Sequence, residues 1–209
     1  MTITGAPSAP AVPVAARRPG RPRAEGHDER IVAAAALLLD RGEEVTISAV
    51  VELSGVSRAA IYRRWPSLTD LLAAALDRGR EPYVIPLDGD LLENVLGTFS
   101  IARAAGATYT EERFRLRLRL AMTDRRLARA YWNAHVARRR GGMVAVLEAG
   151  IARGELANDI DIDACIDAIN GVFYYQYVVR GVTLDDVGAI ERCRAAIRVI
   201  WRGMQVGPA

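Results

Sequence analysis

The sequence contains no lysine. All 28 basic residues are arginine, against 25 acidic residues, and the formal net charge is +3. Arginine carries its charge on a planar fork of donors that suits phosphate and carboxylate groups, but a bias in genome composition explains the missing lysine equally well. Eleven arginines lie between residues 103 and 140 beside three acids, whereas residues 141–209 carry nine acids and six arginines. The basic character is therefore regional.

Cysteine and histidine are also scarce, which limits the chemistry available to the chain. Cys165 and Cys193 lie 28 positions apart without a CxxC motif, and only His27 and His135 could join them as ligands. This spacing argues against a zinc site and against a disulfide framework. We expect both thiols to be reduced in the core, and we expect neither a metal nor a cofactor.

Long apolar segments are missing as well. The longest, residues 31–39, has nine residues, far fewer than the roughly 20 of a transmembrane helix. Near the N-terminus, APAVPVAA is interrupted by two prolines and stands before Arg17 and Arg18, whereas a secretion signal places its charges first. We expect a cytoplasmic protein without a membrane partner. With 209 residues, 51% of them hydrophobic, it can bury a real core.

Residues 1–25 hold five of the nine prolines and few large apolar side chains. Such a composition does not offset the entropy of ordering, so we expect a disordered Pro/Arg-rich arm. Within it, RRPGRPR places Arg21 in a Gly-Arg-Pro core similar to the AT-hook pattern, which can enter a narrow minor groove. A basic tail that only aids solubility is an equally good interpretation of this single copy.

From Asp28 onward the apolar residues recur with helical spacing. DERIVAAAALLLDRG predicts a first helix that ends at Gly42, a residue suited to a left-handed cap. Thr46 is a good N-cap for a short second helix, and Ser57 can cap a third after the glycine turn at Gly55. Two short helices joined by such a turn are a candidate helix-turn-helix.

The chain after this motif also has a helical pattern. Trp65 and Pro66 end the third helix, and SLTD at residues 67–70 is a capping box that opens a fourth. Further helices are expected over roughly 88–105, 110–122, 124–153, 160–180 and 185–203. FRLRLRL at residues 114–120 alternates like a strand, but no second strand can satisfy its backbone groups, so we favour helix. The fold class is therefore all-α.

The third helix has the chemistry of a helix that reads DNA. Such a helix needs small or polar side chains at its N-terminal end for base edges, and donors around it for phosphates. Arginine can contact guanine through two hydrogen bonds, and alanine can contact the thymine methyl group. The candidate DNA-binding residues are Thr46, Ser48, Ser57, Arg58, Ala59, Ala60, Tyr62, Arg63 and Arg64, with Arg21 in the arm.

The segment TISAVVELSGVSRAAIYRRWPSLTDLLAAAL resembles the DNA-binding module of the TetR (tetracycline repressor) family of bacterial regulators. The resemblance implies a DNA-binding domain at residues 26–76, a C-terminal ligand-binding and dimerisation domain at 77–209, and a homodimer through the last two helices. It also implies a small-molecule effector that opposes binding to a palindromic operator. Two positions depart from the family: Leu68 stands where a phosphate-binding lysine is common, and Val51 replaces a usual alanine.

For the effector, the polar and aromatic residues of the central helices are the candidates, although each is also a plausible core or surface residue. They are Phe114, Met122, Trp132, His135, Asn170, Tyr174 and Gln176. An enzyme is disfavoured because there is no nucleophile elbow, phosphate loop or metal cluster. The remaining alternative is a helical protein-interaction module that binds DNA without sequence preference.

Overall fold

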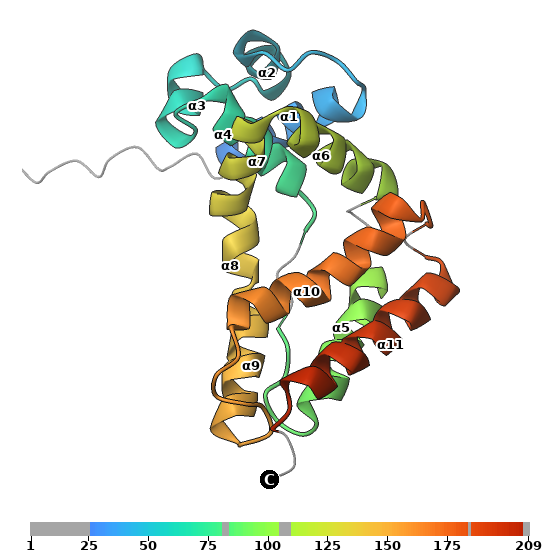
Figure 1. The fold of residues 1–209 in the computed structure, drawn as a ribbon. Coiled ribbons are helices and arrows are strands. Elements are labelled where there is room, and N and C mark those ends of the chain that lie inside the picture. The colour runs from blue at the N-terminus through green and yellow to red at the C-terminus, as the bar shows by residue number, and fades with distance from the viewer. Residues whose placement is uncertain (1–25, 81–83, 105–109, 184, 207–209) are drawn as a thin grey trace, which may run out of the picture.

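The structure is a computed structural model that describes residues 26–80, 84–104, 110–183 and 185–206, with the backbone alone for 99–104. Over these residues the chain is helical, and an isolated bridge between Leu156 and Gln205 is the sole β-type pairing (Figure 1). The predicted all-α class is confirmed. The predicted arm, including Arg21, lies outside the described residues. None of the helices that the structure describes is long and apolar enough to cross a bilayer.

The first four helices lie where the sequence predicts them, with small differences at their ends. They are α1 (His27–Asp40), α2 (Ile47–Ser54), α3 (Arg58–Arg64) and α4 (Leu68–Asp77). The Thr46 hydroxyl accepts a hydrogen bond from the Ala49 N–H at the start of α2, and the Ser57 hydroxyl accepts one from Ala60 at the start of α3. Gly55 has a φ of 65°, a left-handed conformation that glycine adopts without strain. The predicted turn between α2 and α3 is therefore confirmed.

One apolar cluster holds α1 to α4 together as a compact head. Val50 of α2, Ile61 of α3 and Leu71 of α4 are each fully buried in one cluster with the apolar residues of α1. The two departures from the family pattern, Val51 and Leu68, are half-buried and pack against the same cluster. Leu68 therefore contributes to the packing of the head.

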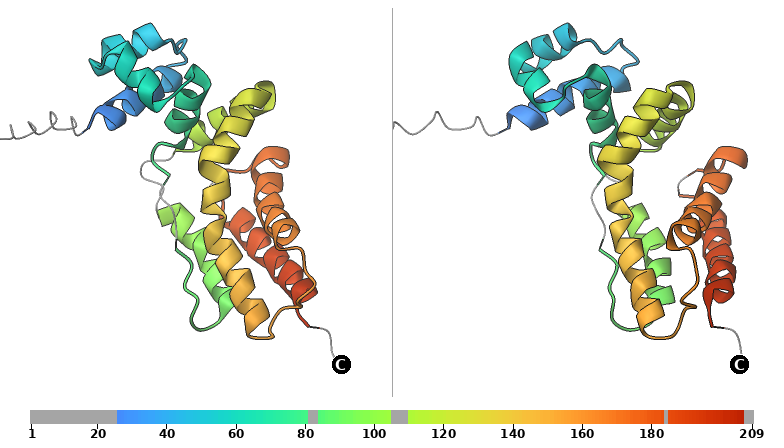
Figure 2. Two further views of the ribbon diagram at one scale, coloured as in Figure 1. Left: turned by 90° about the vertical axis from the view of Figure 1, so that its left-hand side faces the viewer. Right: turned by 60° about the vertical axis from the view of Figure 1, so that its left-hand side comes forward.

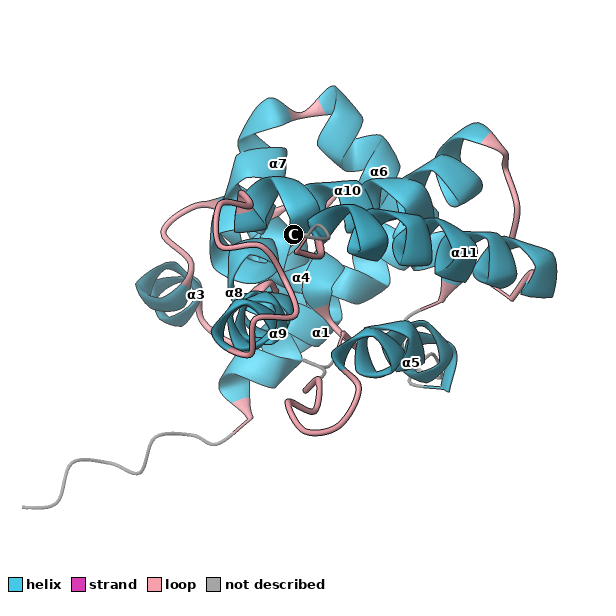
Figure 3. Ribbon diagram, turned by 60° about the horizontal axis from the view of Figure 1, so that its bottom comes forward, coloured by secondary structure: helices cyan, strands magenta, loops and turns pink. Residues whose placement is uncertain are grey.

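The remaining elements form the C-terminal part. They are α5 (Leu91–Ala104), α6 (Glu111–Thr123), α7 (Arg125–Tyr131), a π-turn (Trp132–Val136), α8 (Ala137–Arg139), α9 (Gly141–Ala152), α10 (Ile162–Tyr174), a second π-turn (Tyr175–Val179) and α11 (Val187–Met204). Helices α5, α9, α10 and α11 enclose the second core, at the end opposite the head (Figure 3). Ile166, Ile197 and Trp201 are buried in it, as their helical spacing predicts. The cysteines are free thiols; Cys193 is buried, but Cys165 is only half-buried.

Two predictions about the central helices need comment. The segment FRLRLRL is helical, as predicted, because Arg113 and Arg117 bury their side chains on the same face as Phe114. The expected single helix over 124–153 is wrong, since a π-turn and a turn residue, Arg140, divide it into α7, α8 and α9. The predicted helix over 160–180 likewise changes to π-winding in its last turn.

Candidate nucleic-acid interface and effector site

Helix α3 is fixed to the head by one buried side chain and presents the rest of its surface to solvent. Ile61 is fully buried, and Ala60 is half-buried beside it. The exposed residues at and along α3 are Ser57, Arg58, Ala59, Tyr62, Arg63 and Arg64. All six were predicted as DNA contacts, so the structure brings them together on one accessible helix. This helix lies at the end of the molecule farthest from the C-terminal core (Figure 1).

The hydroxyl groups at α2 and α3 differ in their hydrogen-bond partners. Those of Thr46 and Ser57 accept hydrogen bonds from backbone N–H groups as helix caps. Ser48 is exposed on α2, and its Oγ accepts a hydrogen bond of 2.8 Å from the Arg58 guanidinium. The contact joins the supporting helix to the candidate reading helix, and it orients the side chain best suited to guanine.

At the other end of α3, Arg64 reaches back to α1. Its Nε lies 3.3 Å from Asp28 Oδ2, and both side chains are about half exposed (52% and 51%). An exposed pair of this kind contributes little stability, and a phosphate can replace the carboxylate as the partner of Arg64. Sequence reasoning did not single out Asp28, because the two residues are distant in sequence and meet only where α1 passes the end of α3.

The predicted effector residues are only partly brought together. The ring of Phe114 on α6 is buried and stacks on Tyr174 of α10 with a centroid distance of 6.3 Å. Phe173 and Tyr177 close on the same ring at 6.0 Å each, edge to face. Burial raises the pKa of Tyr177 to about 12, so its phenol is neutral. This aromatic cluster joins α6 to α10.

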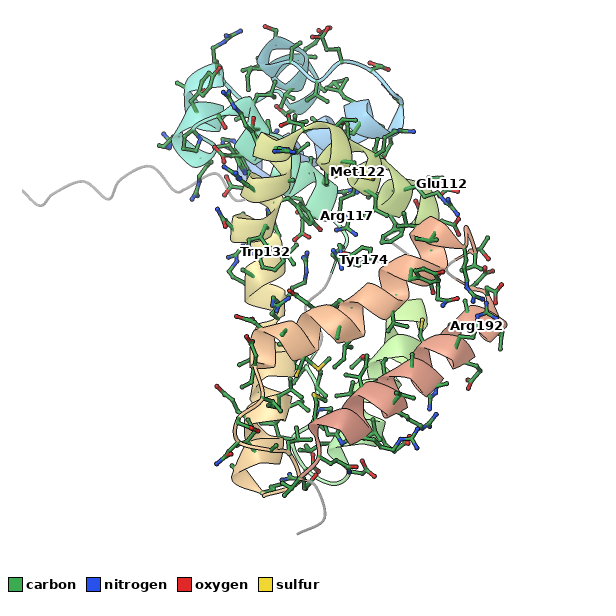
Figure 4. All side chains as sticks on the ribbon, viewed as in Figure 1. Glu112, Arg117, Met122, Trp132, Tyr174 and Arg192 are labelled. Carbon is green, nitrogen blue, oxygen red and sulfur yellow. The ribbon has the colours of Figure 1, made fainter. Side chains whose placement is uncertain are left out.

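Arginine side chains continue the cluster toward the first π-turn. The Arg117 guanidinium is buried and lies 5.2 Å from the ring centroids of both Phe114 and Tyr131. Arg140 lies 5.3 Å from the ring of Trp132 and pairs with Asp163 and Asp167 of α10. Figure 4 shows Arg117, Trp132 and Tyr174 around one region bordered by α6, the first π-turn and α10.

The other predicted effector residues lie elsewhere or are engaged. Met122 is 78% exposed at the end of α6. His135 contacts Asp77 of α4 through its Nδ1 at 2.9 Å. Asn170 is exposed on α10 and donates to the Ile166 carbonyl one turn earlier. Gln176 is buried and accepts a hydrogen bond from Arg192 of α11. Arg117 and Tyr131 were missed in the sequence, where nothing distinguishes Arg117 from the other arginines of its segment.

A cavity of about 300 Å³ lies at a different place, between the end of α1 and the start of α6. The residues that line it are Leu39, Asp40, Gly42, Thr110, Glu112, Arg113, Leu116 and Arg119. None of them was predicted for the effector. Arg113 pairs there with Asp40 and donates to the Arg78 carbonyl, so this side chain ties α6 to the head.

Two family profiles match this chain. "Bacterial regulatory proteins, tetR family" matches residues 31–75, and "Tetracyclin repressor-like, C-terminal domain" matches residues 85–196. The uncharacterized HTH-type transcriptional regulator YdeS of Bacillus subtilis is 30% identical over 174 residues, which cover 80% of this chain and 86% of YdeS.

Solved structures have the same fold. The TetR family transcription regulator SCO0332 gives a TM-score of 0.64 at 23% identity, with 88% of this chain and all of that chain covered. The multidrug binding protein EbrR, complexed with ethidium, gives a TM-score of 0.52 at 17% identity, with 86% and 99% covered.

Proposed function

This chain belongs to the TetR family and is an HTH-type transcriptional regulator; from that premise we propose that it is a repressor that a small molecule releases from a palindromic operator. The observation that carries the proposal is the exposed surface of α3. On this surface Arg58 is held in position by a hydrogen bond to Ser48 of α2. Arg58 with Ala59 and Ala60 would read bases, and Tyr62, Arg63 and Arg64 would contact the phosphate backbone.

A palindromic operator requires a two-fold dimer, and α10 and α11 have the surface for it. Both carry exposed rows of small or apolar residues at helical spacing. They are Ala164, Ala168 and Gly171 on α10, Tyr175 and Val178 on the second π-turn that continues it, and Ala195, Val199, Gly203 and Val206 on or just after α11. Small residues let two helices approach closely, and apolar area of this kind is rarely left open to water. In such a dimer the two α3 helices would lie about 34–36 Å apart, or a multiple of one DNA turn.

We place the effector in the region bordered by α6, the first π-turn and α10. Phe114, Trp132 and Tyr174 border this region, and Trp132 and Tyr174 keep 44% and 38% of their surface exposed. Aromatic walls with a few polar groups are typical of small-molecule sites. EbrR binds the aromatic cation ethidium, but here the guanidinium groups of Arg117 and Arg140 already lie on the aromatic faces. A neutral or anionic effector therefore fits this chain better than a cation.

Selection of bound sites from random DNA tests the function directly. The full-length protein should recover a near-palindrome, and fluorescence anisotropy should show tighter binding to that site than to its scrambled version at physiological salt. The protein-interaction alternative predicts equal affinity for both sequences. Equal affinities would therefore refute the proposal of a specific regulator.

A further inference from the structure

Three side chains from one segment of the C-terminal part converge on Asp77, the last residue of α4. The Tyr131 hydroxyl donates to Asp77 Oδ1 at 3.0 Å, and His135 Nδ1 lies 2.9 Å from Oδ2. Arg139 pairs with the same carboxylate and also donates to the Tyr131 hydroxyl. The side chain of Asp77 is only 16% exposed. Both carboxylate oxygens are thus held by the segment from α7 to α8.

The π-turn makes this convergence possible. In an α-helix, residues eight apart such as Tyr131 and Arg139 would point about 80° apart around the axis. The π-turn closes with a hydrogen bond from the Ala137 N–H to the Trp132 carbonyl, five residues back. The π-turn contains one residue more than the corresponding α-helical turn. This extra residue reduces the angle between the Tyr131 and Arg139 side chains around the axis to about 20°. Both side chains therefore face α4 together with His135.

Apolar packing surrounds the polar contact and joins the same two elements. Leu76 of α4 and Leu127 of α7 are buried in a small cluster that also includes the ring of Tyr131. Arg80, just beyond α4, donates to the Tyr131 hydroxyl at 2.8 Å. Helices α4 and α7, which carry this cluster, pack together where the head meets the C-terminal part (Figure 2). Hydrogen bonds weaken steeply as their angles depart from linearity, so three of them to one carboxylate fix a direction.

We propose that Asp77 is a positioning residue for operator recognition. By binding Tyr131, His135 and Arg139, it fixes the direction in which α4 carries the head relative to the C-terminal part, and so the separation of the two α3 helices in the dimer. The effect of Asp77 on operator binding rests on the proposed function, whereas its effect on the orientation of the head does not. Asp77 itself stands at the end of α4 opposite the one that follows α3.

The orientation can be measured without DNA and without a dimer interface. In a Cys165→Ala, Cys193→Ala background, nitroxide labels at Ala59→Cys on α3 and Glu148→Cys on α9 report the distance from head to C-terminal part by pulsed electron resonance. Both positions are exposed. Mixing with an excess of unlabelled protein leaves one labelled chain per dimer. We expect one narrow distance distribution, which becomes at least twice as broad in Asp77→Asn.

A matched variant separates this role from the general loss of an ion pair. Asp167→Asn removes a carboxylate that also pairs with an arginine, Arg140, but stands on α10 and is 68% exposed. Its distribution should remain narrow. Tyr131→Phe keeps the ring and removes one hydrogen bond from Asp77, so it should broaden the distribution less than Asp77→Asn. A distribution that stays unchanged in Asp77→Asn would overturn the proposal.

Operator spacing gives a second readout. On the selected site, Asp77→Asn should weaken binding about tenfold, the loss expected when only about a tenth of the dimers hold the productive orientation, but it should weaken binding less when one base pair is inserted between the half-sites. An equal loss at both spacings would indicate a merely structural role and overturn the proposal. If the wild type recovers no site, the repressor proposal fails, and the distance measurement still decides the role of Asp77.

Discussion

The Arg58 guanidinium donates a hydrogen bond of 2.8 Å to the hydroxyl of Ser48, ten residues earlier on the neighbouring helix. The residue suited to reading guanine is therefore already oriented in the free protein, by a group that belongs to the supporting helix. An oriented side chain loses less conformational entropy when it binds. Under the proposed function, this contact lets α2 contribute to specificity through Arg58.

Replacing Ser48 with alanine should therefore relax base preference without touching the base. We expect Ser48→Ala to reduce discrimination at the position that Arg58 reads, by less than the roughly 1–3 kcal/mol expected for Arg58→Ala. Anisotropy titrations of single-base operator variants measure it. In the double variant the loss of discrimination should be smaller than the sum of the losses in the two single variants, since the hydrogen bond needs both partners. Fully additive effects would show that Ser48 acts only on the phosphate backbone.

The two glycines of the proposed dimer surface allow dimerisation to be separated from folding. A Cβ atom added at Gly171 or Gly203 meets nothing within 4 Å in the single chain. Leucine there should stabilise the helix by up to about 1 kcal/mol through its propensity, yet convert the dimer to a monomer by preventing close helix approach. Sedimentation velocity and thermal unfolding test this. Gly141→Leu, on α9 and equally open, should remain dimeric; a Gly171→Leu protein that also remains dimeric would contradict the proposed interface.

Because of the first π-turn, we expect the protein to tolerate the deletion of one residue within this turn. Removing Ala134 should convert the π-turn into regular α-helix and bring Tyr131 and Arg139 one residue closer in sequence. The two side chains would then point about 20° apart around the helix axis, as they do in the protein with the π-turn. The melting temperature should fall by only a few degrees. Removing Ala145 from the regular helix α9 rotates the following residues by about 100° and displaces Val146 and Leu147, which are fully buried. If both deletions are equally destabilising, the register argument is wrong.

Asp77 should make stability depend on pH in a defined direction. Its burial opposes ionisation, but the hydrogen bonds from His135 and Arg139 outweigh this and hold the pKa of Asp77 below its ordinary value of 3.8. Because the folded-state pKa is the lower one, the ionised carboxylate stabilises the fold above about pH 4, and this contribution is lost as the pH falls through the folded-state pKa.

Asp77→Asn should accordingly lower the free energy of unfolding at neutral pH by roughly 1–3 kcal/mol. The difference from the wild type should narrow in urea titrations carried from pH 5 to pH 3. Asp167→Asn, whose carboxylate is largely exposed, should show a much smaller difference throughout. A gap between Asp77→Asn and the wild type that does not change with pH would contradict the assignment.

Local chemistry allowed the head to be predicted closely from the sequence. Thr46, Gly55, Ser57 and the capping box at Ser67 act through backbone groups within a few residues, so their effect is written in the chain itself. The alternating segment at 114–120 was also predicted correctly as helix, because the sequence offered no second strand. The DNA contacts and the domain boundary at residues 76–77, in the last turn of α4, remain predictions.

The sequence by itself thus determined the helical class, the turn before α3 and the exposed residues that α3 presents, since these follow from caps, periodicity and residue chemistry. Only the tertiary structure decided that Arg58 meets Ser48, that Arg117 lies between two aromatic rings, and that Tyr131, His135 and Arg139 share Asp77. These contacts depend on where distant helices cross and on a π-turn that shifts the register by one residue. Apolar periodicity does not encode such a shift, because it assumes regular α-helical winding.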